Sequence, residues 1–258
     1  MAADLTGQTV LITGASSGIG RACAVSFAEA GSRLILVARR TERLAELAVD
    51  LRERAGAEVL TESLDVRDRE GIDAWISGLE PSWAAIDILI NNAGLARGLS
   101  TFWEGEISDW EEMLDTNVKG LLWVTRAVLS GMVARGRGHV INIGSIAGHE
   151  TYPGGTVYCA SKHAVTAIGR ALNIDVLGTG VRVSSVDPGL VETEFSVVRF
   201  HGDRQRADAV YDGLVPLTGH DVADAVLFCA TRPPHANVRE MILMPSAQAA
   251  AVHVHRRT

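Results

Sequence analysis

The sequence predicts an α/β fold, a single doubly wound domain over residues 1–258, with a mostly parallel seven-stranded central sheet and helices on both faces. Two observations predict it. Short runs rich in Val, Ile and Leu alternate with longer stretches of helical periodicity along the whole chain. These runs lack polar alternation, which is typical of parallel strands covered on both faces. With right-handed crossovers, such a sheet binds ligands beyond the carboxyl ends of its strands.

The expected elements follow one another in β-α-β order. Strands are expected at 9–13, 33–38, 58–65, 86–91, 139–145, 181–187 and 240–244. Helices are expected at 19–30, 41–55, 69–79, 108–135, 157–177 and 221–231. The remaining long segment, about 190–217, carries aromatic side chains and two glycines, and we predict that it forms a mobile substrate lid.

The composition limits the kinds of partner that the protein is expected to bind. A net charge of −7 argues against nucleic acid or an anionic membrane as the partner. No stretch offers the ~18 uninterrupted apolar residues of a membrane span, and the first residues lack the pattern of a secretory signal. The three cysteines have no CxxC spacing and are expected to be buried apolar fillers in a reducing compartment. A cytoplasmic protein that acts on a small molecule is therefore expected.

A glycine-rich turn, TGASSGIG at 13–20, joins the first expected strand to the first expected helix. Its glycines permit a tight turn and close approach of a ligand, and the helix start offers free N–H groups to a pyrophosphate. A glycine-rich turn alone is a weak signal, but this position favours a dinucleotide site in a Rossmann-like fold. The residues expected to contact the cofactor here are Gly14, Ser16, Ser17, Gly18, Ile19 and Gly20.

The end of the second expected strand indicates which dinucleotide binds. NAD sites place an acidic residue about 20 residues beyond the glycines, whereas this chain has Arg39 and Arg40 there and no carboxylate. Guanidinium groups pair well with phosphate, so we predict NADP(H) as the cofactor. The alternative is that both arginines are solvated at the start of the next helix.

Two further strand ends are expected to border the cofactor. At one, Asp65 is placed to accept a hydrogen bond from the adenine amino group while Val66 lies against the ring; a strand-end cap is the alternative. At the other, small and amide residues allow close approach of the backbone, although an ordinary turn has the same composition. These residues are Asn92, Ala93 and Gly94.

Tyr158 and Lys162 are the centre of the predicted catalytic site. Residues four apart on a helix share one face, and a neighbouring opposite charge moves a pKa by roughly 1–3 from the ~10 of a free tyrosine. We therefore expect the cation to lower the pKa of Tyr158 toward neutrality, although an accidental surface pair has the same spacing. Ser145, thirteen positions earlier at a strand end, is expected to converge with Tyr158 on one substrate oxygen.

Asn117 is the last polar residue of interest, because it interrupts an otherwise amphipathic helix where asparagine is unfavourable. A functional role is one explanation, and a tolerated polar residue is the other. His253 and His255 have spacing that suits a metal, but a frayed or packed tail explains them better, and no metal site is predicted.

Together these motifs resemble the classical short-chain dehydrogenases/reductases over nearly the whole chain. TGASSGIG, NNAG at 91–94, Asn117, Ser145, YCASK at 158–162 and Asp187-Pro188-Gly189 fall in that family's order and spacing. The resemblance implies that Asn117, Ser145, Tyr158 and Lys162 are catalytic, with Asn117 anchoring a water near the lysine. It implies that Tyr158 and Lys162 also touch the cofactor, as do Pro188, Gly189, Val191 and Thr193. It further implies a homotetramer, or a dimer.

A narrower likeness points to the NADP-dependent 3-hydroxy acid dehydrogenases. It rests on 38–44, 91–96, 189–195 with Val198 and Arg199, and 241–245 with Gln248. The expected reaction is hydride transfer between nicotinamide and a small 3-hydroxy acid or its semialdehyde. Arg199 is a candidate clamp for the substrate carboxylate, with pairing to a neighbour such as Asp203 as the alternative. Arg97, His149 and Cys159 depart from that branch and leave the substrate open.

Three other functions remain as alternatives. The first is an NADPH-dependent reductase of another small aldehyde or ketone, for example one bearing a sulfonate that uses the same arginine. The second is a non-catalytic NADPH-binding regulator, which is expected to have lost the tyrosine or lysine that this chain retains. An extended-type epimerase or dehydratase fits poorly, because the glycine spacing and short C-terminal part resemble the classical branch.

Overall fold

The computed structural model describes residues 4–257, whose seven strands form one parallel sheet in the order β3-β2-β1-β4-β5-β6-β7. This confirms the predicted fold class, with every strand pair parallel. The chain order reverses between β1 and β4, which is where doubly wound sheets bind ligands. The strands are β1 (Thr9–Thr13), β2 (Arg33–Ala38), β3 (Val59–Ser63), β4 (Ile88–Asn91), β5 (Gly138–Ile143), β6 (Val181–Pro188) and β7 (Glu240–Leu243).

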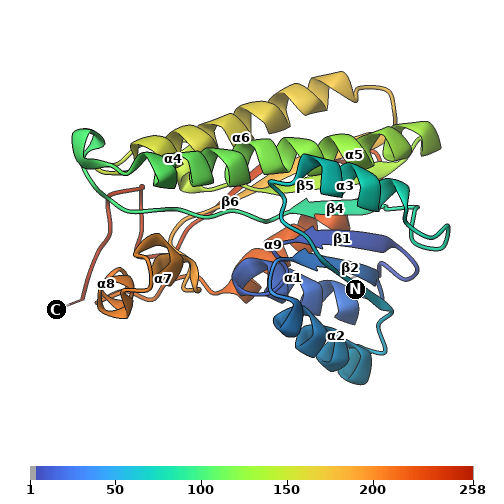
Figure 1. Ribbon diagram of the computed structural model, residues 1–258, viewed down its shortest axis with the longest axis horizontal. Helices are drawn as coiled ribbons and strands as arrows, with labels where there is room; N and C mark the ends of the chain where they lie inside the picture. The colour runs from blue at the N-terminus through green and yellow to red at the C-terminus, as the bar shows by residue number, and fades with distance from the viewer. Residues whose placement is uncertain (1–3, 258) are drawn as a thin grey trace.

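Helices cover both faces of the sheet (Figure 1). One face carries α1 (Gly18–Glu29), α2 (Thr41–Ala55) and α9 (Gly219–Ala230). The other carries α3 (Arg69–Ser77), α4 (Ile107–Leu114), α5 (Leu121–Arg135) and α6 (Thr156–Asp175). Two short helices, α7 (Phe195–Arg199) and α8 (Arg204–Ala209), lie apart from both layers, inside the expected lid segment.

The continuous apolar runs are explained by the two cores that they serve. Along β2, Leu34 and Leu36 pack into the core under α1, α2 and α9. The residues between and after them, Ile35 and Val37, pack into the core under α3 and α5. All four side chains are at most 1% exposed, so a strand with two buried faces needs no polar alternation.

The expected single helix over 108–135 is interrupted. A π-helical turn, Asp115–Gly120, separates α4 from α5 and contains Asn117. Such wide turns are rare and often lie at functional sites. The helix axis keeps its direction through the turn. The prediction was therefore wrong only in treating this stretch as one regular α-helix.

Within the described part of the chain, no helix has the length and apolarity needed to cross a bilayer. Among these same residues, no cluster of three or more His, Cys, Asp or Glu side chains is arranged to hold a metal ion.

Candidate active site

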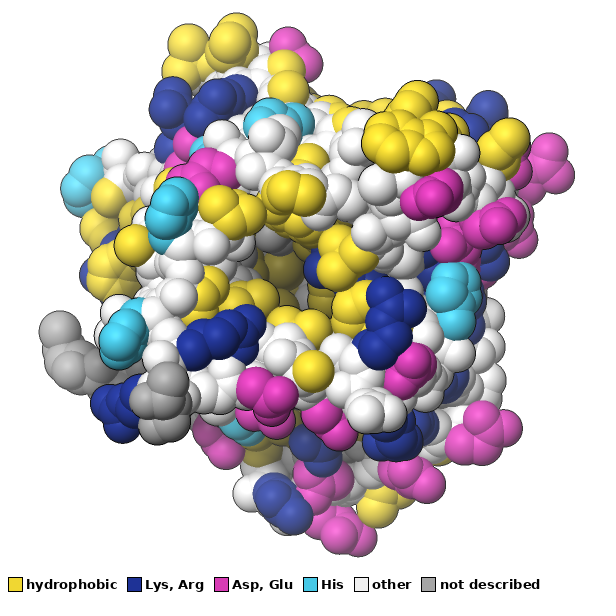
Figure 2. All heavy atoms as spheres, turned by 90° about the vertical axis from the view of Figure 1, so that its left-hand side faces the viewer, with side chains coloured by type: hydrophobic (Ala, Val, Ile, Leu, Met, Phe, Trp, Pro, Cys, Tyr) yellow, Lys and Arg dark blue, Asp and Glu magenta, His cyan; other side chains and the backbone are white. Residues whose placement is uncertain are grey.

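A cavity of about 330 Å³ opens at the carboxyl ends of β1, β2, β4, β5 and β6, against residues 191–198 of the segment expected to form a lid. Figure 2 shows this side of the molecule, where apolar side chains surround a hollow. The cavity wall contains every predicted cofactor residue except Gly20, together with Ser145, Tyr158 and Lys162. Asn117 lies behind that wall, and Arg199 lies directly against two of the wall residues, Tyr158 and Phe195. The structure thus gathers residues that are far apart in sequence, and their roles remain predictions.

The glycine-rich turn is closely packed against the end of β4. Gly14 has φ +66°, and a Cβ there would lie 2.9 Å from the Cα atom of Ala93, so a side chain would displace the neighbouring strand end. Gly20 has a similar role behind the wall, because a Cβ would collide with the Asn92 amide nitrogen. That amide donates to the Thr13 and Gly14 carbonyls, at 2.9 and 3.2 Å. The turn and the β4 end therefore form one rigid floor.

Arg39 and Arg40 both line the cavity but differ in their partners. The Arg39 side chain is 56% exposed, and its Nη1 lies 3.9 Å from Asp65 and 4.0 Å from Glu112, too far for hydrogen bonds. Arg40 donates to the hydroxyls of Ser16 and Ser17, with a shortest distance of 2.6 Å. Arg39 is thus the more available of the two for an anionic ligand.

Glu194 of the lid also lines the cavity, and the sequence analysis did not single it out. Its carboxylate accepts from Arg40 at 2.8 Å and from Arg43 at 2.6 Å. These hydrogen bonds, with Arg40 the larger contributor, hold the pKa of Glu194 below its usual value. No local pattern could have revealed this contact, because the partners are more than 150 positions apart. It ties the start of α7 to the expected phosphate site.

Asp65 and Val66 lie on the wall at the end of β3. Burial raises the pKa of Asp65, but hydrogen bonds from Arg67 outweigh it, so the net pKa is below the usual value. Arg67 Nη2 donates to the carboxylate at 2.6 Å. Asp65 is therefore an ionised acceptor, held in place by a neighbouring guanidinium, as the predicted adenine contact requires.

Tyr158 and Lys162 are both buried on α6, with exposed fractions of 8% and 7%. Lys162 Nζ donates to the Ile143 carbonyl at 2.9 Å, at the end of β5 and next to Gly144 and Ser145 on the wall. Ser145 begins a 3₁₀ turn, and its hydroxyl accepts from the Ala147 N–H at 3.1 Å. The hydroxyl, phenol and ammonium groups therefore share one wall of the cavity.

The expectation that Lys162 lowers the pKa of Tyr158 does not match this geometry. Burial raises the pKa of Tyr158 above its usual value, and the groups that oppose this effect are Arg199 and the Ser145 hydroxyl. Burial also lowers the pKa of Lys162, to about 8, although the Asp187 carboxylate acts against it. The sequence argument counted the attraction between two groups and omitted the larger cost of removing each of them from water.

Asn117 clamps the loop that follows β4. Its Oδ1 accepts from the Leu95 N–H at 2.8 Å, while its Nδ2 donates to the Leu95 carbonyl at 2.8 Å and to the Ser161 hydroxyl at 3.0 Å. The side chain is 2% exposed. The π-helical turn thus directs an amide to a loop whose Leu95 lines the cavity, which makes Asn117 a structural support of the site.

His149, one of the departures from the expected branch, is paired with a buried carboxylate. Its Nε2 lies 2.8 Å from Asp187 Oδ2, and Asp187 Oδ1 accepts from the Ser185 hydroxyl at 2.5 Å. Burial of Asp187 raises its pKa despite these hydrogen bonds. This pair fixes the end of β6, from which Pro188 and Gly189 continue along the cavity wall.

Arg199, at the end of α7, lies among three aromatic rings. Its guanidinium carbon is 5.0 Å from the ring centre of Tyr158, 5.2 Å from that of Phe195 and 5.7 Å from that of Tyr152. Nη2 donates to the Tyr152 hydroxyl at 2.6 Å, and Nε is buried without a hydrogen-bond partner. Within residues 4–257 it forms no ion pair with Asp203 or any other carboxylate.

The fold and this crevice together define a dinucleotide-dependent oxidoreductase: a glycine-rich turn at the switch point, with a buried tyrosine, lysine and serine beside it. Comparison with known proteins gives the family. The family model described as short chain dehydrogenase matches residues 8–203. The chain belongs to the short-chain dehydrogenases, as its motifs suggested.

Three individual proteins show how far the similarity extends. An NADP-dependent 3-hydroxy acid dehydrogenase of Schizosaccharomyces pombe is 46% identical over 254 residues, which is 98% of each chain. Sulfoacetaldehyde reductase 2 of Chromohalobacter salexigens is 46% identical over 241 residues, 93% of this chain and 95% of that one. The solved closed form of a serine dehydrogenase with NADP+ has a TM-score of 0.90 at 45% identity, covering 97% of this chain and 100% of that one.

Proposed function

We propose that the protein is an NADP(H)-dependent oxidoreductase that moves a hydride between nicotinamide and the alcohol or carbonyl carbon of a 3-hydroxy acid or its semialdehyde. The observation that carries this proposal is Arg199, a cation 5.0 Å from the Tyr158 ring that has no carboxylate partner among residues 4–257. An anionic substrate supplies the missing partner. The names of the hydroxy acid relatives support the same substrate class.

The assignment of NADP(H) rests on the charges at the end of β2. The wall residues fit a 2′-phosphate, because Arg39 is held only by long ion pairs and the Ser16 and Ser17 hydroxyls lie beside Arg40. The similarity of the chain to an NADP-dependent dehydrogenase and to an NADP+ complex agrees with the NADP(H) cofactor that the sequence predicts. We expect Arg39→Leu to weaken NADPH binding at least about tenfold, or ~1.4 kcal/mol, and to leave NADH binding unchanged.

In the proposed reaction the chain's own residues hold the substrate and move one proton. Ser145 donates a hydrogen bond to the substrate oxygen, and Tyr158 gives a proton to it in reduction or takes one in oxidation. Lys162 supports the same wall and is placed to contact the nicotinamide ribose. Bound NADP(H) supplies or accepts the hydride.

Arg199 is proposed to pair with the acid group of the substrate. The test compares kcat/KM for a 3-hydroxy acid and for its neutral amide, in wild type and in Arg199→Met. We expect a loss of about 10- to 150-fold for the acid, because a charge-assisted pair contributes roughly 1.5–3 kcal/mol. The amide should lose less than about fivefold. Equal losses on both substrates would reject the clamp.

A second candidate reaction is the reduction of a sulfonate-bearing aldehyde. It is favoured by the similarity to sulfoacetaldehyde reductase 2 of Chromohalobacter salexigens. A sulfonate is also an anion, so it would pair with the Arg199 guanidinium as a carboxylate would. A screen of NADPH oxidation with sulfoacetaldehyde and semialdehydes, and of NADP+ reduction with the hydroxy acids, separates the two; NADH and NAD+ are tested in parallel. A kcat/KM for sulfoacetaldehyde above that for every semialdehyde would replace the hydroxy acid proposal.

We further infer a homotetramer in the cytoplasm. Apolar side chains remain exposed on the helix layer formed by α4, α5 and α6 and just beyond the end of α6. They are Leu114, Leu122, Val133, Ile174 and Leu177. Large exposed apolar patches mark interfaces. The three cysteines are buried and unpaired, which suits a reducing compartment. Light scattering on the purified protein checks the assembly, and the mass of one chain would contradict it.

A further inference from the structure

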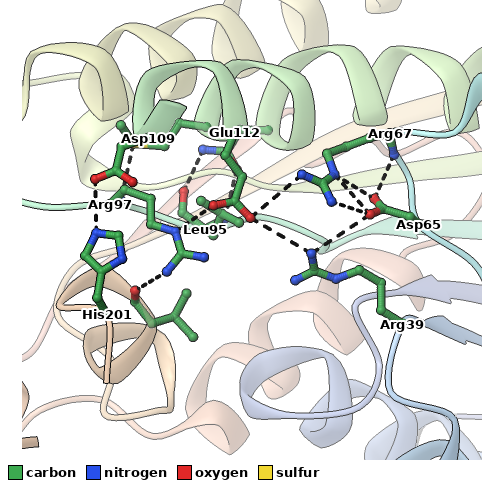
Figure 3. Close-up of polar contacts among 11 residues, drawn as sticks. Arg39, Asp65, Arg67, Leu95, Arg97, Asp109, Glu112 and His201 are labelled. Atoms are coloured by element: carbon green, nitrogen blue, oxygen red, sulfur yellow. Dashed lines mark hydrogen bonds and ion pairs between the residues drawn. The ribbon is translucent and has the colours of Figure 1, made fainter. Parts of the chain in front are cut away.

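Arg97 was expected at the mouth of the substrate cavity, but its guanidinium is engaged elsewhere. Nε donates to Glu112 Oε2 at 2.7 Å, and Nη1 donates to the Val198 carbonyl at 2.6 Å (Figure 3). Arg97 is absent from the wall of the main cavity. It therefore bridges helix α4 to the lid.

The lid contact of Arg97 is close to Arg199. The carbonyl that it binds belongs to Val198, and the next carbonyl, that of Arg199, accepts from the Gly98 N–H at 2.8 Å. Residues 97 and 98 thus hold two successive carbonyl groups at the end of α7. Because a helix end that is fixed in this way cannot rotate freely, these contacts fix the backbone from which the Arg199 side chain extends toward Tyr152 and Tyr158.

Glu112 anchors the bridge from the other side. The Arg97 and Glu112 side chains are 19% and 20% exposed, so the pair is largely sheltered from solvent. The second carboxylate oxygen lies 3.8 Å from Arg67 and 4.0 Å from Arg39. The hydrogen bond from Arg97 is the largest effect that lowers the pKa of Glu112. An ionised, enclosed carboxylate keeps the Arg97 fork in one orientation.

A second polar side-chain contact between α4 and the lid region, beside the apolar cluster that includes Met113, Phe195 and Val198, is weaker. His201 Nε2 lies 3.0 Å from Asp109 Oδ2, but the His201 side chain is 57% exposed. Exposed pairs contribute little to stability because water and salt screen them. Arg97 is therefore the main side-chain support of this end of α7 among the contacts that Figure 3 shows.

We propose that Arg97 is a positioning residue for substrate specificity: with Glu112, it holds the end of α7 so that Arg199 faces the substrate beside Tyr158. This inference rests on the proposed pairing of Arg199 with the acid group. It assigns Arg97 no contact with the substrate. The consequence is that a change at Arg97 should act on acid substrates through Arg199 and leave the proton transfer at Tyr158 unchanged.

The test is a double-mutant cycle with Arg97→Met, Arg199→Met and the combined variant, each assayed for oxidation of a 3-hydroxy acid and of its amide at saturating NADP+. We expect Arg97→Met to raise KM for the acid about tenfold, with kcat within about threefold. KM for the amide should stay within about twofold of wild type. The combined variant should be no worse on the acid than Arg199→Met alone, because both changes remove one interaction.

Two further variants control for the loss of a lid contact and for charge. His201→Asn removes the exposed contact between the lid region and Asp109 and keeps both Arg97 and Glu112, and we expect it to keep the wild-type KM for the acid. Arg97→Lys retains a cation for Glu112 but lacks the fork that also reaches Val198, so its KM should be intermediate. NADPH affinity, measured by fluorescence, shows whether each variant is folded. If Arg97→Met does not fold, the Lys variant carries the test.

The outcomes separate this inference from the function on which it rests. If Arg199→Met weakens acid and amide equally, the acid clamp itself fails. If Arg199→Met is selective for the acid but Arg97→Met raises both KM values alike, only the positioning role is overturned. The same holds if the effects of the two changes multiply, or if His201→Asn raises KM for the acid as much as Arg97→Met does.

Discussion

At the scale of single residues, burial sets the protonation of the proposed catalytic groups. Tyr158 and Lys162 are one helical turn apart, yet the lysine donates to the Ile143 carbonyl and burial acts on the two pKa values in opposite directions. The phenol keeps its proton and the ammonium loses its proton more easily. A phenol that retains its proton can act as a general acid, so Tyr158 starts in the protonated form that the proposed carbonyl reduction uses.

Replacing Tyr158 by Phe removes that proton and little else, because the ring still packs against Phe195 at 5.6 Å. We expect kcat to fall by about 10²–10⁴-fold, the usual contribution of a general acid. NADPH affinity, measured by fluorescence, should stay within about threefold of wild type.

Tyr152→Phe is the matched comparison for this prediction. Its hydroxyl contacts Arg199 at 2.6 Å and has no part in the proposed proton transfer. We expect its effect to appear in KM for acid substrates, with kcat largely kept. A Tyr158→Phe enzyme that keeps wild-type turnover would remove Tyr158 from its proposed role.

At the scale of elements, the π-helical turn explains why an asparagine occupies an apolar helix. The wider turn allows Asn117 to satisfy both backbone groups of Leu95, which would otherwise be buried polar groups without partners. The loop after β4 has no helix or strand of its own at this point. Its shape therefore depends on a side chain that lies 22 residues further along the chain.

Removing this clamp should destabilise the fold as well as the site. For Asn117→Ala we expect the free energy of unfolding to fall by about 2–4 kcal/mol, because two buried backbone groups lose their partners. Ser161→Ala removes only the third contact of the amide, at 3.0 Å, and should cost about 1 kcal/mol or less. Urea unfolding measures both. Equal losses for the two variants would show that the Leu95 contacts are not what stabilises the loop.

At the scale of the whole molecule, the sequence predicted the features that have a local pattern, such as strands and strand-end motifs. It missed the contacts between residues that are far apart in the chain. The β1 and β2 bounds were predicted correctly, since strands buried on both faces are continuous apolar runs. β3 ends earlier than expected, at Ser63, because the residues after it leave the sheet to border the cavity. The glycine turn and the serine, tyrosine and lysine were found because they follow strand ends or share a helix face.

The remaining contacts of the site have no local signal. Arg97 and Glu112 are 15 positions apart, and the Val198 carbonyl is 101 positions from Arg97. Glu194 reaches arginines on the opposite side of the cavity in the same way. The pKa of Tyr158 depends on the degree of burial, which a motif does not contain. These features require the folded chain.

The burial of Lys162 also gives the whole protein a dependence of stability on pH. Its pKa is lowered from 10.5 to about 8 in the folded protein. Between these two values the unfolded chain binds more protons, so this group makes the free energy of unfolding rise with pH. The stabilisation is complete above pH 10.5 and is lost as the pH falls through about 8. At pH 7 the folded protein therefore carries the full cost of a buried cation.

Lys162→Met abolishes this titration. We expect the variant to gain stability relative to wild type at pH 7, and the difference in unfolding free energy between the two to shrink by roughly 2–3 kcal/mol as the pH rises to 10.5. The loss of the hydrogen bond to Ile143 changes the difference in unfolding free energy by the same amount at every pH. The test is therefore how this difference changes with pH. Urea unfolding at intervals from pH 7 to 10.5 measures it, with Lys119→Met, whose side chain is 59% exposed, as the comparator for general effects of pH. A difference between wild type and Lys162→Met that stays constant over this range would mean that Lys162 is not held as a buried cation in the folded protein.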